Sequence, residues 1–161
     1  MSFTDLHTPM HPGILSYGLR DFQHRGPACL KQVISGQAGR SFPLGASVFA
    51  DSVNISVFSR RASRVELLLF DDSAAAQAAR VIELDAGTHR TYHYWHAFVP
   101  GIGPGQVYAY RASGPFDPAH GLHFDPDKVL VDPYGRAVVV PDAYSRHLAS
   151  QRGENTATGT R

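Results

Sequence analysis

The chain has 161 residues, 43% of them hydrophobic, and a formal net charge of +1. This length provides for one domain and a tail rather than for two full domains. The near balance of charges argues against nucleic-acid binding, which would gather basic residues on one face. No apolar run approaches the ~20 residues that span a bilayer, and the N-terminal segment lacks the pattern of a secretory signal, so we expect no membrane partner.

A single cysteine, Cys29, excludes an internal disulfide and any multi-cysteine metal site. We interpret it as an unreactive thiol rather than as a nucleophile. This composition favours a cytoplasmic location. A plastid transit peptide in the mildly basic first forty residues is the alternative, although such peptides are normally richer in serine.

The chain divides into three parts. Residues 1–36 carry scattered glycines and prolines without a sustained period, so we expect a poorly ordered leader. Residues 37–144 consist of short strand patterns separated by turns, which predicts an all-β sandwich. Residues 145–161 are polar and rich in glycine and threonine, and we expect a disordered tail or a severed linker.

Four strand patterns carry the prediction of a sandwich. Residues 53–58 alternate apolar and polar side chains, which predicts a strand with one buried face. Residues 64–70 are apolar on both sides, which predicts a central strand covered on both faces or one face that meets another domain. Residues 92–99 are rich in aromatic residues suited to a pleated surface, and a Gly/Pro-rich turn separates them from a strand at 107–111.

Beyond these strands, three Asp-Pro pairs begin at Asp117, Asp125 and Asp132. Proline lacks a backbone donor and restrains the residue before it, so this stretch cannot form a regular central strand. Aspartate side chains in such turns accept hydrogen bonds from nearby backbone N–H groups.

The order of these elements resembles the N-terminal domain of glycogen-debranching and isoamylase enzymes. The similar segments are Phe42–Ala46, NISVFS at 54–59, RVELLLF at 64–70, WHAFVPG at 95–101, GQVYAYR at 105–111 and GPFDP at 114–118, continuing to Tyr134. Ser113 and Asp125 depart from the commonest pattern. The resemblance implies an immunoglobulin-like β-sandwich of the carbohydrate-binding module family 48 type. In full-length relatives it precedes a glycoside hydrolase family 13 barrel that cleaves α-1,6 linkages in glycogen or amylopectin.

The residues themselves do not predict catalysis in this chain. Glycoside hydrolysis usually needs two carboxyl groups that flank the bond, and Glu66, Glu83 and Glu154 are poorly placed to share a cleft. A catalytic barrel takes about 250 residues, more than follow Tyr134. We therefore expect an inactive chain without cofactor. Histidines 89, 93 and 96 invite a zinc hypothesis, but residues three apart on a strand face opposite sides, so we expect no metal.

Two groups of residues are candidates for binding. Trp95, Tyr92 and Tyr94 could stack on glucose rings, although core packing is the favoured role of Trp95. Arg111, Lys128, Asp132 and Tyr134 could brace the module against the missing barrel, with local ion pairing as the alternative.

We predict that the chain is an accessory module of a debranching enzyme. Its expected partner is an α-glucan, glycogen or amylopectin, which the parent enzyme binds. The alternatives are a free-standing α-glucan-binding module that recruits partners to glycogen and a module of a branching or trehalose-releasing relative. The pattern from Tyr108 to Tyr134 disfavours the last of these.

Overall fold

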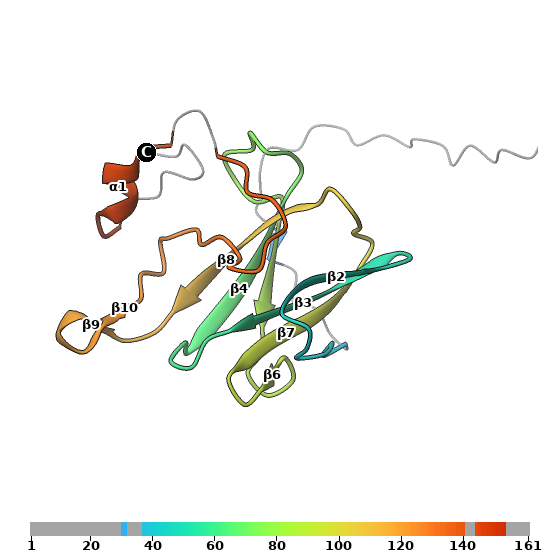
Figure 1. The fold of residues 1–161 in the computed structure, drawn as a ribbon, viewed down its shortest axis with the longest axis horizontal. Helices are drawn as coiled ribbons and strands as arrows, with labels where there is room; N and C mark the ends of the chain where they lie inside the picture. The colour runs from blue at the N-terminus through green and yellow to red at the C-terminus, as the bar shows by residue number, and fades with distance from the viewer. Residues whose placement is uncertain (1–29, 32–36, 141–143, 154–161) are drawn as a thin grey trace, which may run out of the picture.

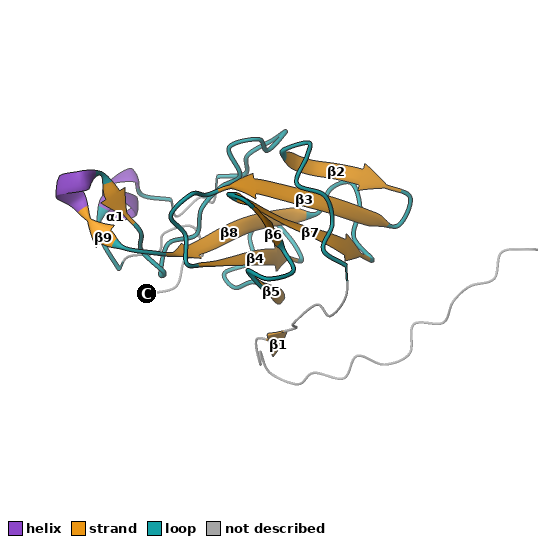
Figure 2. Cartoon of the chain, turned by 90° about the horizontal axis from the view of Figure 1, so that it is seen from below, coloured by secondary structure: helices purple, strands orange, loops and turns teal. Residues whose placement is uncertain are grey.

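The computed structural model describes residues 30–31, 37–140 and 144–153, and two four-stranded sheets form the centre of this part (Figure 1). The first sheet has the order β1–β5–β4–β8, with bounds Leu30–Lys31, Arg80–Leu84, Arg64–Phe70 and Val107–Ser113. The second has the order β2–β3–β7–β6, with bounds Gly45–Phe49, Ser52–Phe58, Tyr94–Pro100 and Arg90–Thr91. Neighbouring strands are antiparallel except β1 and β5. Figure 2 shows the two layers of the predicted sandwich.

The remaining elements are short. Strands β9 (Phe116–Asp117) and β10 (Leu122–His123) form a small hairpin around a 3-10 helix at Pro118–His120. A single turn of helix, α1 (Arg146–Ser150), follows near the end of the chain. Figure 1 shows these elements beside the sandwich rather than within its layers. Within the described residues, no helix is long and apolar enough to cross a membrane.

Strand β4 is covered on both faces, as its sequence predicts. Val65, Leu67 and Leu69 lie in the main core between the two sheets. Leu68 and Phe70 point to the other face, where they form a second buried cluster. The loop after β4 and the segment after β10 cover this second cluster, so the covering residues belong to this chain.

Strand β3 is also buried on both faces, and the prediction of a single buried face was wrong. We call residues 37–41 the polar strap, because their backbone crosses the outer side of β3 and binds its polar side chains. Asn54 accepts a hydrogen bond from the Arg40 amide at 2.6 Å and donates to the Arg40 carbonyl at 2.9 Å. The Ser56 hydroxyl donates to the Ser41 carbonyl at 2.7 Å. The strap therefore buries polar residues that the alternation pattern assigned to solvent.

The neighbouring strand β7 contributes to the same contact. The His96 Nδ1 lies against the Ala38 carbonyl, and its Nε2 lies 2.8 Å from the Thr91 hydroxyl. Because a carbonyl can only accept, the His96 Nδ1 carries a proton that points to Ala38. Gly39 has a φ of +69°, and a Cβ there would lie 2.7 Å from the backbone of Ala97. The strap thus depends on a glycine at its closest approach to the sheet.

The hairpin between β6 and β7 differs from the predicted strand at residues 92–99. Strand β7 begins at Tyr94, and Tyr92 and His93 form the turn before it. Tyr92 has a φ of 60°, in the left-handed region that non-glycine residues rarely adopt. The Tyr92 ring therefore leaves the pleated surface and is 79% exposed.

Both ends of the chain contain regular structure that the sequence did not predict. In the leader, Leu30–Lys31 pairs with β5 as the parallel strand β1. In the tail, α1 begins after Ser145, whose hydroxyl accepts a hydrogen bond from the Leu148 amide at 3.4 Å. The rest of the leader before residue 37 and the tail from 154 onward lie outside the described residues.

The described part of the tail is attached to the loop around β9. The Gly153 amide donates to the Asp125 carboxylate at 2.7 Å, and the Arg152 guanidinium carbon lies 4.0 Å from the centre of the Phe116 ring. These contacts, together with α1, show that residues 145–153 are folded against the module. In this stretch the structure differs from the disordered tail that we expected, while the alternative of a severed linker remains a prediction.

Candidate functional site

Trp95, the first candidate for stacking on a sugar, lies in the core between the sheets. Its side chain is 0% exposed, and its indole N–H donates to the Ser59 carbonyl at 3.3 Å. The Arg90 guanidinium carbon lies 5.0 Å from the ring centre. A ring without an exposed face cannot stack on glucose, so the structure favours the packing role for Trp95.

The other two candidates lie at one end of the second sheet with two further rings. Tyr94 is half-buried and pairs across the sheet with Phe58, whose ring centre is 5.4 Å away. The Tyr92 ring centre lies 4.0 Å from that of His93, which also makes an edge contact with Phe58 at 6.0 Å. We call Phe58, Tyr92, His93 and Tyr94 the aromatic cluster. Tyr92 and Phe58, 79% and 49% exposed, present flat apolar surface to solvent.

Two of the candidates for docking, Arg111 and Lys128, have partners within the chain. The Arg111 Nε is 2.8 Å from a carboxylate oxygen of the buried Glu66, which also binds Arg64 at 2.8 Å. The Lys128 ammonium donates to the Leu148 carbonyl of α1 at 3.3 Å. These contacts agree with the alternative of local pairing.

Asp132 is a buried acceptor rather than a surface carboxylate. It accepts hydrogen bonds from the Tyr108 hydroxyl at 2.7 Å and from the Tyr134 amide at 2.8 Å. Burial, and then the neighbouring Asp132 carboxylate, raise the pKa of Tyr108 well above its usual value, so the phenol stays protonated and donates. Burial likewise raises the pKa of Tyr110. Tyr134 itself is 52% exposed and is the candidate most open to a partner.

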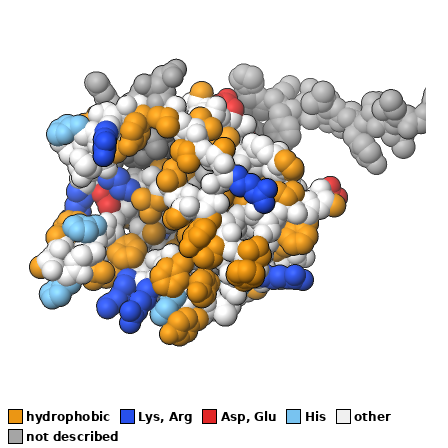
Figure 3. All heavy atoms as spheres, in the orientation of Figure 1, with side chains coloured by type: hydrophobic (Ala, Val, Ile, Leu, Met, Phe, Trp, Pro, Cys, Tyr) orange, Lys and Arg blue, Asp and Glu red, His pale blue; other side chains and the backbone are white. Residues whose placement is uncertain are grey.

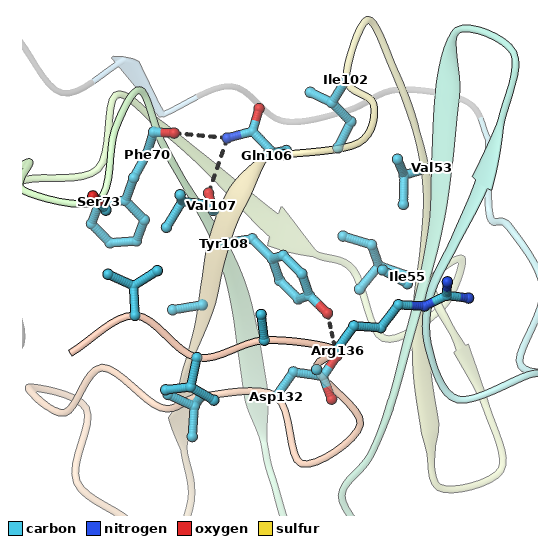
Figure 4. Close-up of a pocket in the computed structure, with 18 of the residues that line it drawn as sticks. Val53, Ile55, Phe70, Ser73, Ile102, Gln106, Val107, Tyr108, Asp132 and Arg136 are labelled. Carbon is cyan, nitrogen blue, oxygen red and sulfur yellow. Dashed lines mark hydrogen bonds between the residues drawn. The ribbon is translucent and has the colours of Figure 1, made fainter.

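A groove of about 590 Å³ opens between the two sheets beside Tyr108 and Asp132 (Figure 4). One wall comes from β2 and β3 and the other from β8, while residues 129–139 cross between them. Apolar side chains form most of its lining, among them Val53, Ile55, Phe70, Val107, Val129 and Val131. Its volume and apolar character fall within the range of protein binding sites.

The rim of the groove is also apolar. Val131, Val138 and Val139 line it and are 61%, 60% and 53% exposed, and Val140 beside them is 62% exposed. Figure 3 shows hydrophobic side chains gathered in several groups on one face of the molecule. Exposed apolar side chains gathered at the rim of an apolar groove are typical of interaction surfaces, which makes this rim a candidate.

Two polar side chains at the groove differ in their bonding. The Gln106 amide nitrogen donates to the Phe70 and Val107 carbonyls at 2.7 and 2.9 Å. Arg136, by contrast, is exposed and makes no hydrogen bond or ion pair with any described residue. Our sequence analysis missed both residues and the groove. The apolar run at 137–140, placed after Asp-Pro turns rather than in a strand pattern, was the available signal.

Histidines 89, 93 and 96 do not form a group that could hold a metal ion. The His89 Nδ1 accepts a hydrogen bond from the Asp85 amide at 3.1 Å, and His96 is bound to the polar strap. In the part of the chain that the structure describes, no three His, Cys, Asp or Glu side chains are placed to hold a metal ion. Cys29 lies outside that part.

Comparisons with known proteins cover most of the sandwich. The chain is 44% identical over 110 residues to a glycogen debranching enzyme of Serratia proteamaculans, with 68% of this chain and 16% of the relative aligned. It is 42% identical over 99 residues to a glycogen operon protein GlgX homolog of Mycobacterium tuberculosis, with 62% of this chain and 13% of that protein aligned. The chain thus spans less than a fifth of the length of these relatives.

Among solved structures, apo pullulanase from Paenibacillus barengoltzii aligns with a TM-score of 0.48 and 19% identity, over 63% of this chain and 14% of that one. Residues 43–135 match a family described as carbohydrate-binding module 48, the isoamylase N-terminal domain. This match covers more than half of the chain and includes β2 to β10. The chain therefore belongs to the carbohydrate-binding module 48 family.

Proposed function

We propose that this chain is the non-catalytic accessory module of a glycogen-debranching enzyme and packs against the catalytic part of that enzyme. The observation that carries the proposal is the exposed apolar face formed by the groove and its rim at Val131, Tyr134, Val138 and Val139. Its support is the family match together with relatives that are several times longer than this chain. We infer a cytoplasmic location for the same enzyme.

The docking surface that we propose differs from the four residues suggested by the sequence. Asp132 is buried beneath this surface and does not contact the partner itself. Its hydrogen bonds orient Tyr108 and the turn that carries Tyr134. Arg111 and Lys128 are engaged within the module. Tyr134 and the valines of the rim supply the contact area, since burying apolar surface contributes about 25 cal/mol per Å².

A chimera tests this proposal. The chain replaces the matching segment of the Serratia proteamaculans relative, and release of branches from glycogen is measured together with the melting temperature. We expect the chimera to debranch glycogen, and Val139→Asp to lower its melting temperature by several degrees, because a charge would be buried at the interface. Ala119→Asp, on the exposed 3-10 helix, is the matched control.

Unchanged stability of the chimera carrying Val139→Asp would contradict docking through this face. The isolated chain should release no branches from glycogen under the same conditions. Debranching by the chain alone would show that the catalytic part is not needed and would refute the proposal.

A second function rests on the aromatic cluster. We propose that Tyr92 and Tyr94, with Phe58 and His93, contact the α-glucan, because exposed flat rings can cover the apolar faces of glucose units. Trp95 has no part in this contact because it is fully buried. The same surface would serve the alternative of a free-standing module that recruits partners to glycogen.

Affinity electrophoresis of the chain in gels containing glycogen tests the contact. We expect glycogen to retard the chain, and Tyr92→Ala to remove most of the retardation without unfolding it, since Tyr92 lies in an exposed turn. Tyr144→Ala, an exposed tyrosine elsewhere, is the control. Equal retardation of all three proteins would exclude the aromatic cluster as the glucan contact.

A further inference from the structure

The groove carries a charge pattern that specifies its occupant more closely than its apolar walls do. Figure 4 shows Arg136 extending from the loop after Asp132 toward Ile55 of β3, at one end of the groove. Ser73 lies at the opposite end, next to Asp72, whose carboxylate is bound to the Ala74 amide. Among the described lining residues, Arg136 is thus the one cation of the groove and lies at one end beside the buried Asp132 carboxylate, while Asp72 lies at the other end.

Arg136 is available to an outside partner. Asp132, the acidic residue beside it in Figure 4, already accepts hydrogen bonds from Tyr108 and Tyr134. Arg136 appears in no ion pair of the described residues. An exposed guanidinium has five N–H donors in a planar fork that matches a carboxylate. The chemical group that fits this end of the groove is thus an anion with paired oxygens, which in an unmodified polypeptide is a carboxylate.

The rim argues for a polypeptide rather than a small molecule. A small ligand could fill 590 Å³ but would leave Val138, Val139 and Val140 exposed around it. A protein surface that inserts apolar side chains into the groove would cover the rim at the same time. Relatives of this chain contain more than 80% of their length outside the matching segment, so such a surface has room to lie in the same protein.

We propose that the groove binds an apolar polypeptide segment with an acidic residue, inserting its apolar side chains between the sheets and pairing its carboxylate with Arg136. This inference rests on the proposed docking function and adds the chemistry of the partner surface. It predicts that the contacting surface of the catalytic part carries an Asp or Glu next to a large apolar side chain.

Three blocked tetrapeptides test the proposal on the full chain. Their sequences are Val-Phe-Asp-Leu, Val-Phe-Asn-Leu and Val-Phe-Lys-Leu, and binding is followed by chemical-shift changes of backbone amides at the groove. We expect the acidic peptide to bind about two- to fivefold more tightly than the amide peptide, the ratio typical of an exposed ion pair, and the lysine peptide to bind most weakly. Shifts should concentrate at Val107, Val129 and Val131.

Two variants and one control assign the preference to its residue. Arg136→Gln should make the three peptides bind equally, and Arg136→Glu should reverse their order. Arg61→Gln removes the same charge from the exposed turn between β3 and β4 and should leave the native order unchanged. Equal binding to Arg136→Gln, a reversed order with Arg136→Glu and an unchanged order with Arg61→Gln together support the proposal.

The other outcomes overturn it in distinguishable ways. Equal binding of all peptides to the native chain would refute the acidic partner while leaving docking through the apolar face intact. Shifts outside the groove, a concentration-dependent dimer that blocks the peptides, or a small molecule that copurifies in the groove would each refute a polypeptide occupant. Failure of the chimera would refute the docking function itself, whatever the peptides do.

Discussion

Replacement of Asn54 by alanine should release the polar strap. The substitution removes both hydrogen bonds between the Asn54 side chain and the backbone of Arg40, at 2.6 and 2.9 Å. Asn54 is 2% exposed, so water has little access to the place where its side chain meets the Arg40 backbone. Each such bond contributes about 1 kcal/mol net, and partners left without a bond add to the loss. We therefore expect the free energy of unfolding to fall by about 2 kcal/mol.

Urea denaturation followed by tryptophan fluorescence measures this loss. Trp95 is the only tryptophan of the chain and is fully buried, so its emission reports the opening of the core. With a slope of about 2 kcal/mol per M, the midpoint should move down by about 1 M urea. Ser47→Ala is the matched control, because Ser47 pairs with Asn54 across the sheet and its hydroxyl makes no hydrogen bond to a described residue.

A second measurement locates the effect. Amide exchange at Arg40 should accelerate in Asn54→Ala, while exchange at the centre of β4 should follow only the change in global stability. If Asn54→Ala shifts the midpoint no more than Ser47→Ala does, the side-chain bonds do not hold the strap and our reasoning is refuted.

Three further predictions concern single groups. Burial lowers the pKa of His89 below 6.5, so the unfolded chain takes up its proton at a higher pH than the folded one. The free energy of unfolding should therefore fall as the pH drops below 6.5. His89→Gln should make the urea midpoint depend less on pH between pH 7 and 5, and an unchanged dependence would contradict this. Glu66→Gln should lower the free energy of unfolding by about 1–2 kcal/mol, because it weakens the pair with Arg111. The same urea denaturation at low and high salt measures this loss, and a midpoint equal to that of the native chain would contradict it. Tyr108→Phe should cost about 1–2 kcal/mol because Asp132 loses its phenol donor, and a neutral effect in calorimetry would exclude that role.

The apolar strands of the sandwich could be predicted from the sequence because their side chains report burial directly. Strand β4 has apolar residues on both sides, and both of its faces are covered. The predicted Asp-Pro turns are also present, since Asp125 and Asp132 accept hydrogen bonds from backbone amides two residues ahead. The family resemblance, drawn from these same segments, was confirmed by the family match.

The polar part of the structure could not be predicted in this way. Asn54 and Ser56 alternate with apolar residues, a pattern that predicts exposure to solvent. They are buried because the polar strap binds their side chains. Tyr92 has a high strand propensity, yet the hairpin places it in the left-handed region. The groove arises where residues distant in sequence cross between two sheets, so no local pattern encodes it.

The polar strap also determines where the module should begin when it is transferred to another protein. The family match starts at residue 43, but the hydrogen bonds that close the outer face of β3 start before it, at residues 38–41. A domain transplanted with the boundaries of the match would bring Asn54, Ser56 and His96 without their backbone partners. A transferred domain that begins at residue 37 would keep these partners and the segment that covers the outer face of β3.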